Sequence, residues 1–106
     1  MESFGKISPA FAAFNAEAPK HSQAWIEMVR SVASASALDE KTQTIAYLSV
    51  LAALRMDNGI PFHVAHAKQL GITREEIISA ILVGLPAAGH AVTQVLPIAL
   101  KTFDEA

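Results

Sequence analysis

The chain has no cysteine, one tryptophan, one tyrosine and few charged residues. The absence of cysteine excludes disulfides, thiol nucleophiles, and zinc or iron–sulfur centres held by cysteine. The 8 lysine and arginine residues are scattered rather than clustered. A protein that binds nucleic acid normally gathers such residues into a basic patch, so we expect no nucleic-acid partner.

Hydrophobic residues, in contrast, make up 52% of the 106 residues, while charged residues make up 17%. A chain of this length fits a single domain over residues 1–106. It is also too short to bury that much apolar surface by itself, so a homo-oligomer is expected. No secretory signal is visible at the N-terminus, and a cytoplasmic location is therefore expected.

One uncharged run, Ile77–Leu100, is long enough to cross a bilayer. It is interrupted by Gly84-Leu85-Pro86-Ala87-Ala88-Gly89, which is typical of a break between two helices, and by Pro97. Apolar runs broken in this way usually form buried elements of a soluble domain. We therefore expect no membrane partner.

Helix signals follow one another along the chain, and strand signals are absent. Ser8 can cap a first helix and Asp39 a third, Gly71 can end the fourth, and Thr73 with Glu76 forms a capping box for the fifth. The sequence predicts an all-α bundle of about six helices. They begin at Pro9 and continue over about 21–35, 40–57, 61–70, 73–85 and 89–103, the last interrupted near Pro97. The helix over 40–57 is apolar nearly all round and is expected to be central.

Several residues, taken in order, resemble one family. They are Pro9, Phe11 and Phe14, then Leu38 to Thr42, then His63, Ala67 and Gly71, then Thr73 to Ile77, and finally Ala88-Gly89. With this order and spacing, most of the chain resembles the carboxymuconolactone decarboxylase-like group, which includes the alkylhydroperoxidase D-like proteins. The resemblance implies a compact oligomeric bundle, commonly a trimer or hexamer, with a pocket near His63.

The chain departs from the peroxidase-type members of that group at three of four redox positions. Those members carry a Cys-x-x-Cys pair, and the corresponding residues here are Met56 and Gly59. Thr44 stands where they have a proton-relaying glutamate, and only His63 is kept. Without a thiolate, peroxide attack and disulfide exchange are impossible. The chain is therefore similar to the decarboxylase branch and is not a cysteine-dependent peroxidase.

His63 is the candidate catalytic residue. On a helix over 61–70 it shares a predicted buried stripe with Ile60, Val64, Ala67 and Leu70. One interpretation is a core histidine that bonds a backbone carbonyl. The other is a general acid or base in a pocket, which suits an imidazole pKa near neutrality. The resemblance adds weight to the second interpretation.

His66, His90 and Arg55 are candidate substrate-binding residues. His66 and His90 could line the same pocket as His63, or could lie in solvent or at an oligomer contact. A metal shared by these histidines needs a third ligand and a stronger motif than His-x-x-His, so no metal and no cofactor are expected. Arg55, on a nearly apolar helix, could hold a substrate carboxylate or extend into solvent.

Two functions remain open at the level of sequence. The first is acid–base chemistry, decarboxylation or lactone chemistry, on a small carboxylated substrate with His63 as the proton-transfer group. The second is a non-enzymatic oligomer that binds a small ligand or only assembles, a degenerate relative of the peroxidases. Whether the protein is an enzyme at all, which would then be a carboxy-lyase, depends on what surrounds His63.

Overall fold

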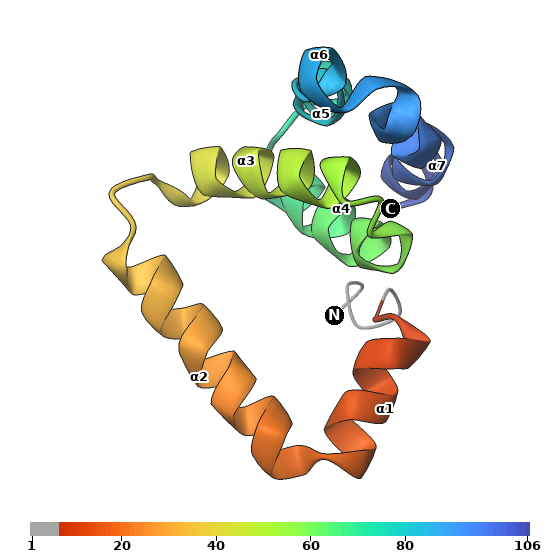
Figure 1. Ribbon diagram of the computed structural model, residues 1–106. Coiled ribbons are helices and arrows are strands. Elements are labelled where there is room, and N and C mark those ends of the chain that lie inside the picture. The colour runs from red at the N-terminus through yellow and green to blue at the C-terminus, as the bar shows by residue number, and fades with distance from the viewer. Residues whose placement is uncertain (1–6) are drawn as a thin grey trace.

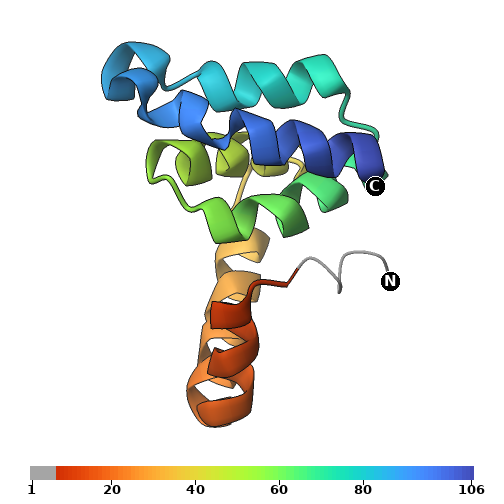
Figure 2. The same ribbon diagram turned by 90° about the vertical axis from the view of Figure 1, so that its right-hand side faces the viewer.

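A computed structural model describes residues 7–106 of the chain, and within them the fold is all-α, as predicted (Figure 1). Helices α1 and α2 form a hairpin, which we call the arm; the remaining elements form the body (Figure 2). In chain order the elements are α1 (Pro9–Glu17), α2 (Pro19–Ala35), α3 (Glu40–Ala53), the 3-10 turn η2 (Asp57–Gly59), α4 (Ile60–Gln69), α5 (Arg74–Leu82), α6 (Leu85–Ala88), the 3-10 segment η3 (Gly89–Val95) and α7 (Leu96–Glu105).

The arm is shaped by local signals. Ser8 caps α1, its Oγ accepting a hydrogen bond of 3.1 Å from the amide of Phe11. Pro19 lies in the first turn of α2, and the preceding Ala18 leaves the helical region at φ −136° and ψ 61°. The chain turns there because a proline disfavours a helical residue before it. The two helices then meet through Phe11 and Trp25, whose ring centroids are 5.3 Å apart.

The body holds the hydrophobic core. Its buried residues come from α3 to α7: Leu48, Leu51, Ala52, Ile60, Val64, Ala67, Ile72, Ile77, Ala80, Ile81, Val92, Val95 and Ala99. Polar contacts fasten the elements that surround this core. Ser49 donates from α3 to the Ala80 carbonyl of α5 at 2.7 Å. Lys68 donates from α4 to the Phe103 carbonyl of α7 at 2.7 Å.

Helix α3 is central, but it is shorter and less enclosed than its sequence predicts. It ends at Ala53 rather than near Asp57. Leu48, Leu51 and Ala52 are buried, whereas Val50 on its other side is exposed. An apolar sequence all round the helix therefore corresponds to one side packed in this chain and another side left open.

The signals around α4 and α5 are confirmed almost residue by residue. Gly71 ends α4 at φ 85°, a left-handed conformation that glycine adopts freely. The amide of Ile72 bonds back to the Ala67 carbonyl at 3.1 Å. Thr73 and Glu76 form both halves of the predicted capping box. Local side-chain chemistry thus fixes where α5 begins.

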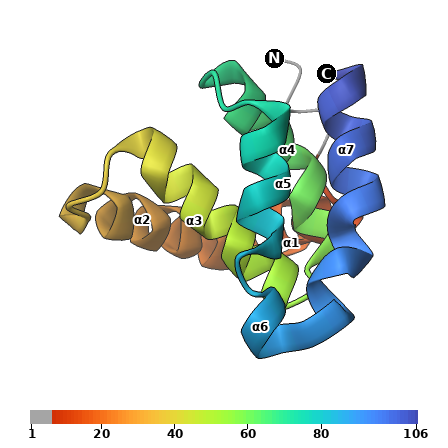
Figure 3. The same ribbon diagram turned by 90° about the horizontal axis from the view of Figure 1, so that it is seen from above.

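The stretch Arg74–Glu105 is long and apolar enough to cross a membrane, judged by length and composition alone. In the structure it is not one straight helix. The predicted break falls where α5 ends at Leu82, and α6 and η3 carry the chain around a turn to α7. Helices α5 and α7 consequently pack against each other in the body (Figure 3).

Candidate functional site

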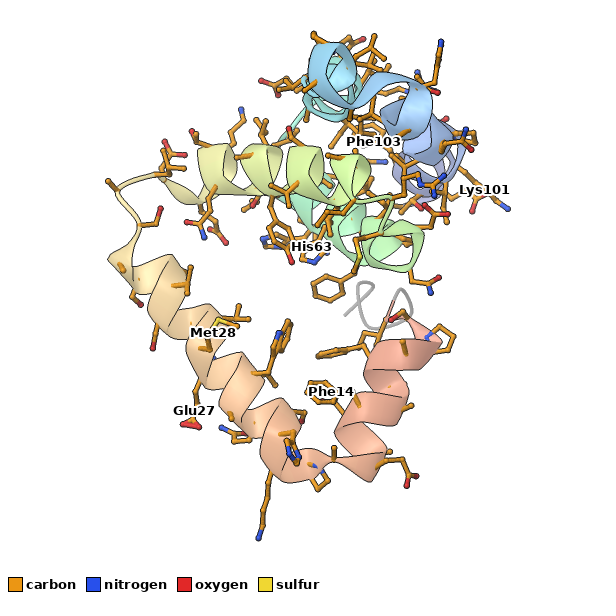
Figure 4. The ribbon with its side chains drawn as sticks, in the orientation of Figure 1. Phe14, Glu27, Met28, His63, Lys101 and Phe103 are labelled. Atoms are coloured by element: carbon orange, nitrogen blue, oxygen red, sulfur yellow. The ribbon has the colours of Figure 1, made fainter. Side chains whose placement is uncertain are left out.

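His63 lies in the first half of α4 at the edge of its buried face. Ile60, Val64 and Ala67 of the predicted stripe are buried, but His63 itself is only partly buried. Its ring meets the edge of Tyr47 from α3, with centroids 4.7 Å apart, and the ring of Phe62 at 5.1 Å. The histidine therefore lies in an aromatic environment at the side of the body that faces the arm (Figure 4).

Burial, together with a smaller effect from the charge of nearby His66, lowers the pKa of His63 from 6.5 to about 4. An imidazole with this pKa is neutral at pH 7, with one nitrogen able to donate and the other able to accept a hydrogen bond. Within residues 7–106, no buried side-chain nitrogen or oxygen lacks a hydrogen-bond partner. The His63 ring nitrogens, which bond no other side chain or carbonyl there, are therefore not fully enclosed by the described part of the chain.

His66 is directed elsewhere. Its Nε2 lies 3.4 Å from Oε2 of Glu40, at the start of α3. Glu40 is thus its nearest charged neighbour, and this contact ties the end of α4 to the beginning of α3. His66 is therefore not directed at the same point as His63, although the two lie three residues apart on one helix.

His90 is exposed at the start of η3, directly after α6. This part of the body lies on the other side of α3 from the labelled His63 (Figure 4). The described part of the chain contains no group of three or more histidine and carboxylate residues able to hold a metal. The three histidines of the sequence pattern thus have three different surroundings in a single chain.

Arg55 follows the end of α3 and has φ 53°, the one positive φ outside glycine among the described residues. The amide of Met56 bonds the Leu51 carbonyl at 2.9 Å, and the Arg55 amide bonds the Ala52 carbonyl at 3.1 Å. These two bonds make a Schellman ending, in which glycine usually takes the place of Arg55. Arg55 also lines an open hollow of about 360 Å³ with Leu54, Asp57 and Gln94. His63 is not part of that hollow.

The positions that would carry thiol chemistry lie between Arg55 and His63. Met56 is half-exposed before η2, and Gly59 immediately precedes α4. Side-chain atoms of Leu51 lie 3.5 Å from where a Cβ on Gly59 would be. The residues of this turn supply no thiol nucleophile.

Sequence reasoning did not single out Tyr47. It lies on the helix that was expected to be apolar all round, and its contact with His63 joins residues far apart in sequence. A signal was present, since Tyr47 is the only tyrosine in the chain and lies within that apolar helix. A buried tyrosine usually has a partner for its hydroxyl, and an exposed one can offer that hydroxyl to a ligand.

Comparison with known proteins decides the family. The sequence profile of the Carboxymuconolactone decarboxylase family matches residues 19–101, from the start of α2 to the middle of α7. The chain belongs to this family. No curated protein and no solved structure gives a significant match. As a family member without cysteine, it has no thiol pair.

Proposed function

We propose that this carboxymuconolactone decarboxylase family protein transfers protons on a small carboxylated or lactone substrate, with His63 as the acid–base group. The observation that carries the proposal is a neutral, partly buried imidazole whose nitrogens bond no other described residue. The apolar rings of Tyr47 and Phe62 border it. Such a group can accept a proton at one nitrogen and donate one from the other.

A carboxylated substrate would suit this histidine electrostatically. Burial keeps the His63 pKa low in the free protein. An anionic carboxylate beside the ring would favour the charged form and raise that pKa towards neutrality, where proton transfer is most efficient. When a carboxylate leaves as carbon dioxide, its electron pair remains on the substrate, and a proton must be delivered to it. Protonated His63 could supply that proton and recover it from water.

Substitution of His63 tests the role directly. We expect His63→Gln to lower kcat/KM for carboxymuconolactone by on the order of 10²–10⁴, the usual contribution of a general acid or base. His66→Gln is the matched control, because it removes a neighbouring imidazole from the same helix, and it should change kcat/KM only a few-fold. Unchanged turnover in His63→Gln would exclude the proposed role.

A second candidate is binding of a small apolar ligand without turnover, and the aromatic residues of the arm favour it. Phe11, Phe14 and Trp25 form a cluster of rings, and Trp25 is 40% exposed. Trp25 is the only tryptophan, so its fluorescence reports on this cluster alone. A saturable change in Trp25 fluorescence on titration with toluene would show binding of an apolar ligand. If the protein also consumes no lactone acid, this function is favoured over catalysis.

Assembly is part of the proposal. Twelve large hydrophobic side chains are exposed in the described chain, among them Val32, Leu54 and Val83 at 60% or more. Surfaces of this kind in a small soluble protein commonly mark protein contacts. We expect a homo-oligomer, with a trimer or hexamer as the form that the family resemblance implies.

A further inference from the structure

The second half of helix α3 carries two hydroxyl groups, and the body uses only one of them. Ser49 donates its hydroxyl to the Ala80 carbonyl of α5 at 2.7 Å, and this bond holds the two helices together. Among the hydrogen bonds of residues 7–106, none involves the hydroxyl of Tyr47. The Tyr47 side chain is also 43% exposed. Its phenol is thus a hydrogen-bond donor that the described part of the chain leaves available to a ligand.

This donor lies beside the imidazole of His63. The two rings meet edge to face, with centroids 4.7 Å apart. They come from α3 and α4, which pack against each other, so the body fixes their separation. Because a phenol hydroxyl is attached directly to its ring, a small planar molecule that contacts the imidazole can reach the hydroxyl as well.

The two side chains offer different chemistry to such a molecule. An imidazole can take up a proton and give it back. A tyrosine hydroxyl can donate a hydrogen bond at neutral pH and keep its proton. A fixed donor of this kind lowers the barrier of a reaction when it is aimed at an oxygen on which negative charge develops. The pair therefore suits a substrate that needs a proton at one atom and a hydrogen bond at another.

We propose that the Tyr47 hydroxyl binds the carbonyl oxygen of the substrate and stabilises the enolate that forms when the carboxylate leaves. This inference rests on the proposed proton transfer by His63 and adds the class of substrate. In that class the carboxylate is β to a lactone carbonyl, or is conjugated with it through a double bond. When the bond to the carboxylate breaks and carbon dioxide leaves, the electron pair moves to the carbonyl oxygen, which accepts the hydrogen bond from Tyr47.

Protonation of carbon then completes the reaction. Protonated His63 gives its proton to the substrate carbon, the enolate electron pair forms the new C–H bond, and the carbonyl is restored. Neutral His63 regains a proton from water, so each carbon dioxide released consumes one proton. Tyr47 keeps its own proton throughout. A carboxylate without a conjugated carbonyl offers no oxygen to receive the electron pair, and we expect no turnover of such a compound.

The aromatic surroundings of His63 strengthen the proposed hydrogen bond. The ring of Phe62 borders the imidazole at 5.1 Å, in addition to the ring of Tyr47. A hydrogen bond to a charged oxygen is stronger where apolar groups exclude part of the water. The flat faces of these rings also match a planar lactone enolate better than a tetrahedral polar molecule.

Equilibrium binding of tetronate, a stable lactone that carries an enolate charge at pH 7, tests the inference without turnover. Calorimetry on the full chain should show binding. Tyr47→Phe, which removes only the hydroxyl, should weaken it by about 10- to 100-fold, the usual effect of one hydrogen bond to a charged group. The uncharged methyl ether of tetronic acid is the ligand control and should be affected much less.

Thr42→Val is the matched control variant, because it removes a hydroxyl from the exposed start of the same helix. It should bind tetronate as the native chain does. Circular dichroism should show native helix content in both variants. Tyr47 is the only tyrosine, so biosynthetic fluorotyrosine labels this position alone and gives a second measurement. Its fluorine resonance should shift saturably with tetronate and much less with the methyl ether.

The outcomes separate this inference from the proposed catalysis. Absence of tetronate binding, equal affinity in Tyr47→Phe, or a fluorine resonance that tetronate does not shift would each overturn the inference. Turnover that His63→Gln abolishes and Tyr47→Phe leaves unchanged would overturn it as well, with the role of His63 intact. A protein that binds tetronate through Tyr47 but leaves carboxymuconolactone unchanged would support the assigned hydrogen bond and contradict the proposed catalysis.

Discussion

The arm and the body are both helical, yet they use their apolar residues differently. In the body, the inward-facing residues of α3 to α7 form one buried core. In the arm, α1 has no buried residue and α2 buries only Ser22, although α2 has the more regular apolar stripe. Apolar residues at helical spacing thus predict that one face of a helix is packed against another element. They do not predict whether that element belongs to the same chain. The arm is not the only place where apolar side chains stay exposed, because Val50, Leu54 and Val83 of the body are exposed as well.

The largest expected difference between arm and body is in the free energy of unfolding that one valine-to-alanine substitution in each region removes. Val64→Ala in the body removes two methyl groups from a fully buried site and should lower the free energy of unfolding by about 2–3 kcal/mol. Val32→Ala in the arm, at 60% exposure, should lower it by less than about 0.5 kcal/mol at protein concentrations too low for assembly. Urea denaturation measures both. Equal losses of unfolding free energy in the two variants would mean that the arm packs on the body of its own chain.

A second, intermediate effect concerns the surface where arm and body face each other. Burial lowers the His63 pKa from 6.5 to about 4. The unfolded chain therefore binds a proton that the folded chain does not, in the window between these values. Stability from this site is fully present above pH 6.5 and is lost as the pH falls towards 4. We expect a loss of about 2 kcal/mol, less than the full conversion because the ring is partly exposed to solvent.

Urea midpoints at pH 7.5 and pH 4.5 would measure this loss, with His63→Gln as the control that should remove it. The measurement is made at one protein concentration, because dissociation of an assembly also changes apparent stability. A midpoint difference that persists in His63→Gln would assign the pH dependence to other groups.

The sequence predicted the parts of the fold that depend on neighbouring residues. Ser8, Asp39 and Thr73 cap the helices that they were expected to cap, because an N-cap needs only a side chain and the amide three residues on. The pairing of His63 with Tyr47 could not be predicted in this way. It depends on how α3 and α4 cross, which is set by the whole core. The placement of His90 and Arg55 relative to His63 could not be predicted either. The segment that carries His90 lies on the other side of α3 (Figure 4), and the hollow lined by Arg55 does not include His63.

The end of α3 was predicted about four residues too late for a related reason. A Schellman motif terminates helix α4, and Gly71 takes the left-handed position in it. Because glycine favours this position, the sequence predicts the end of α4. Helix α3 ends in the same way, but Arg55 takes the left-handed position. Nothing in the sequence marks an arginine for that conformation. The sequence therefore predicts that helix α3 continues to Asp57, whereas in the structure it ends at Ala53.

This pair of helix endings gives the smallest of the predicted effects. Arg55→Gly should raise the free energy of unfolding by about 0.5–1 kcal/mol, because glycine relieves the cost of a left-handed arginine. Gly71→Ala should lower it by about 1 kcal/mol through strain alone, since no atom lies within 4 Å of the new Cβ. Thermal denaturation of the two variants measures both effects.

A gain in stability on Arg55→Gly also bears on why an arginine stands there. Strained residues persist where their side chains are needed, and removing them commonly trades activity for stability. If Arg55 holds a substrate carboxylate, Arg55→Gly should raise KM for a lactone acid while stabilising the chain. His63 does not line the Arg55 hollow, so such an effect would assign substrate binding to that hollow. An unchanged KM would leave Arg55 as a strained helix ending with no part in binding, and would restrict the candidate site to the surroundings of His63 and Tyr47.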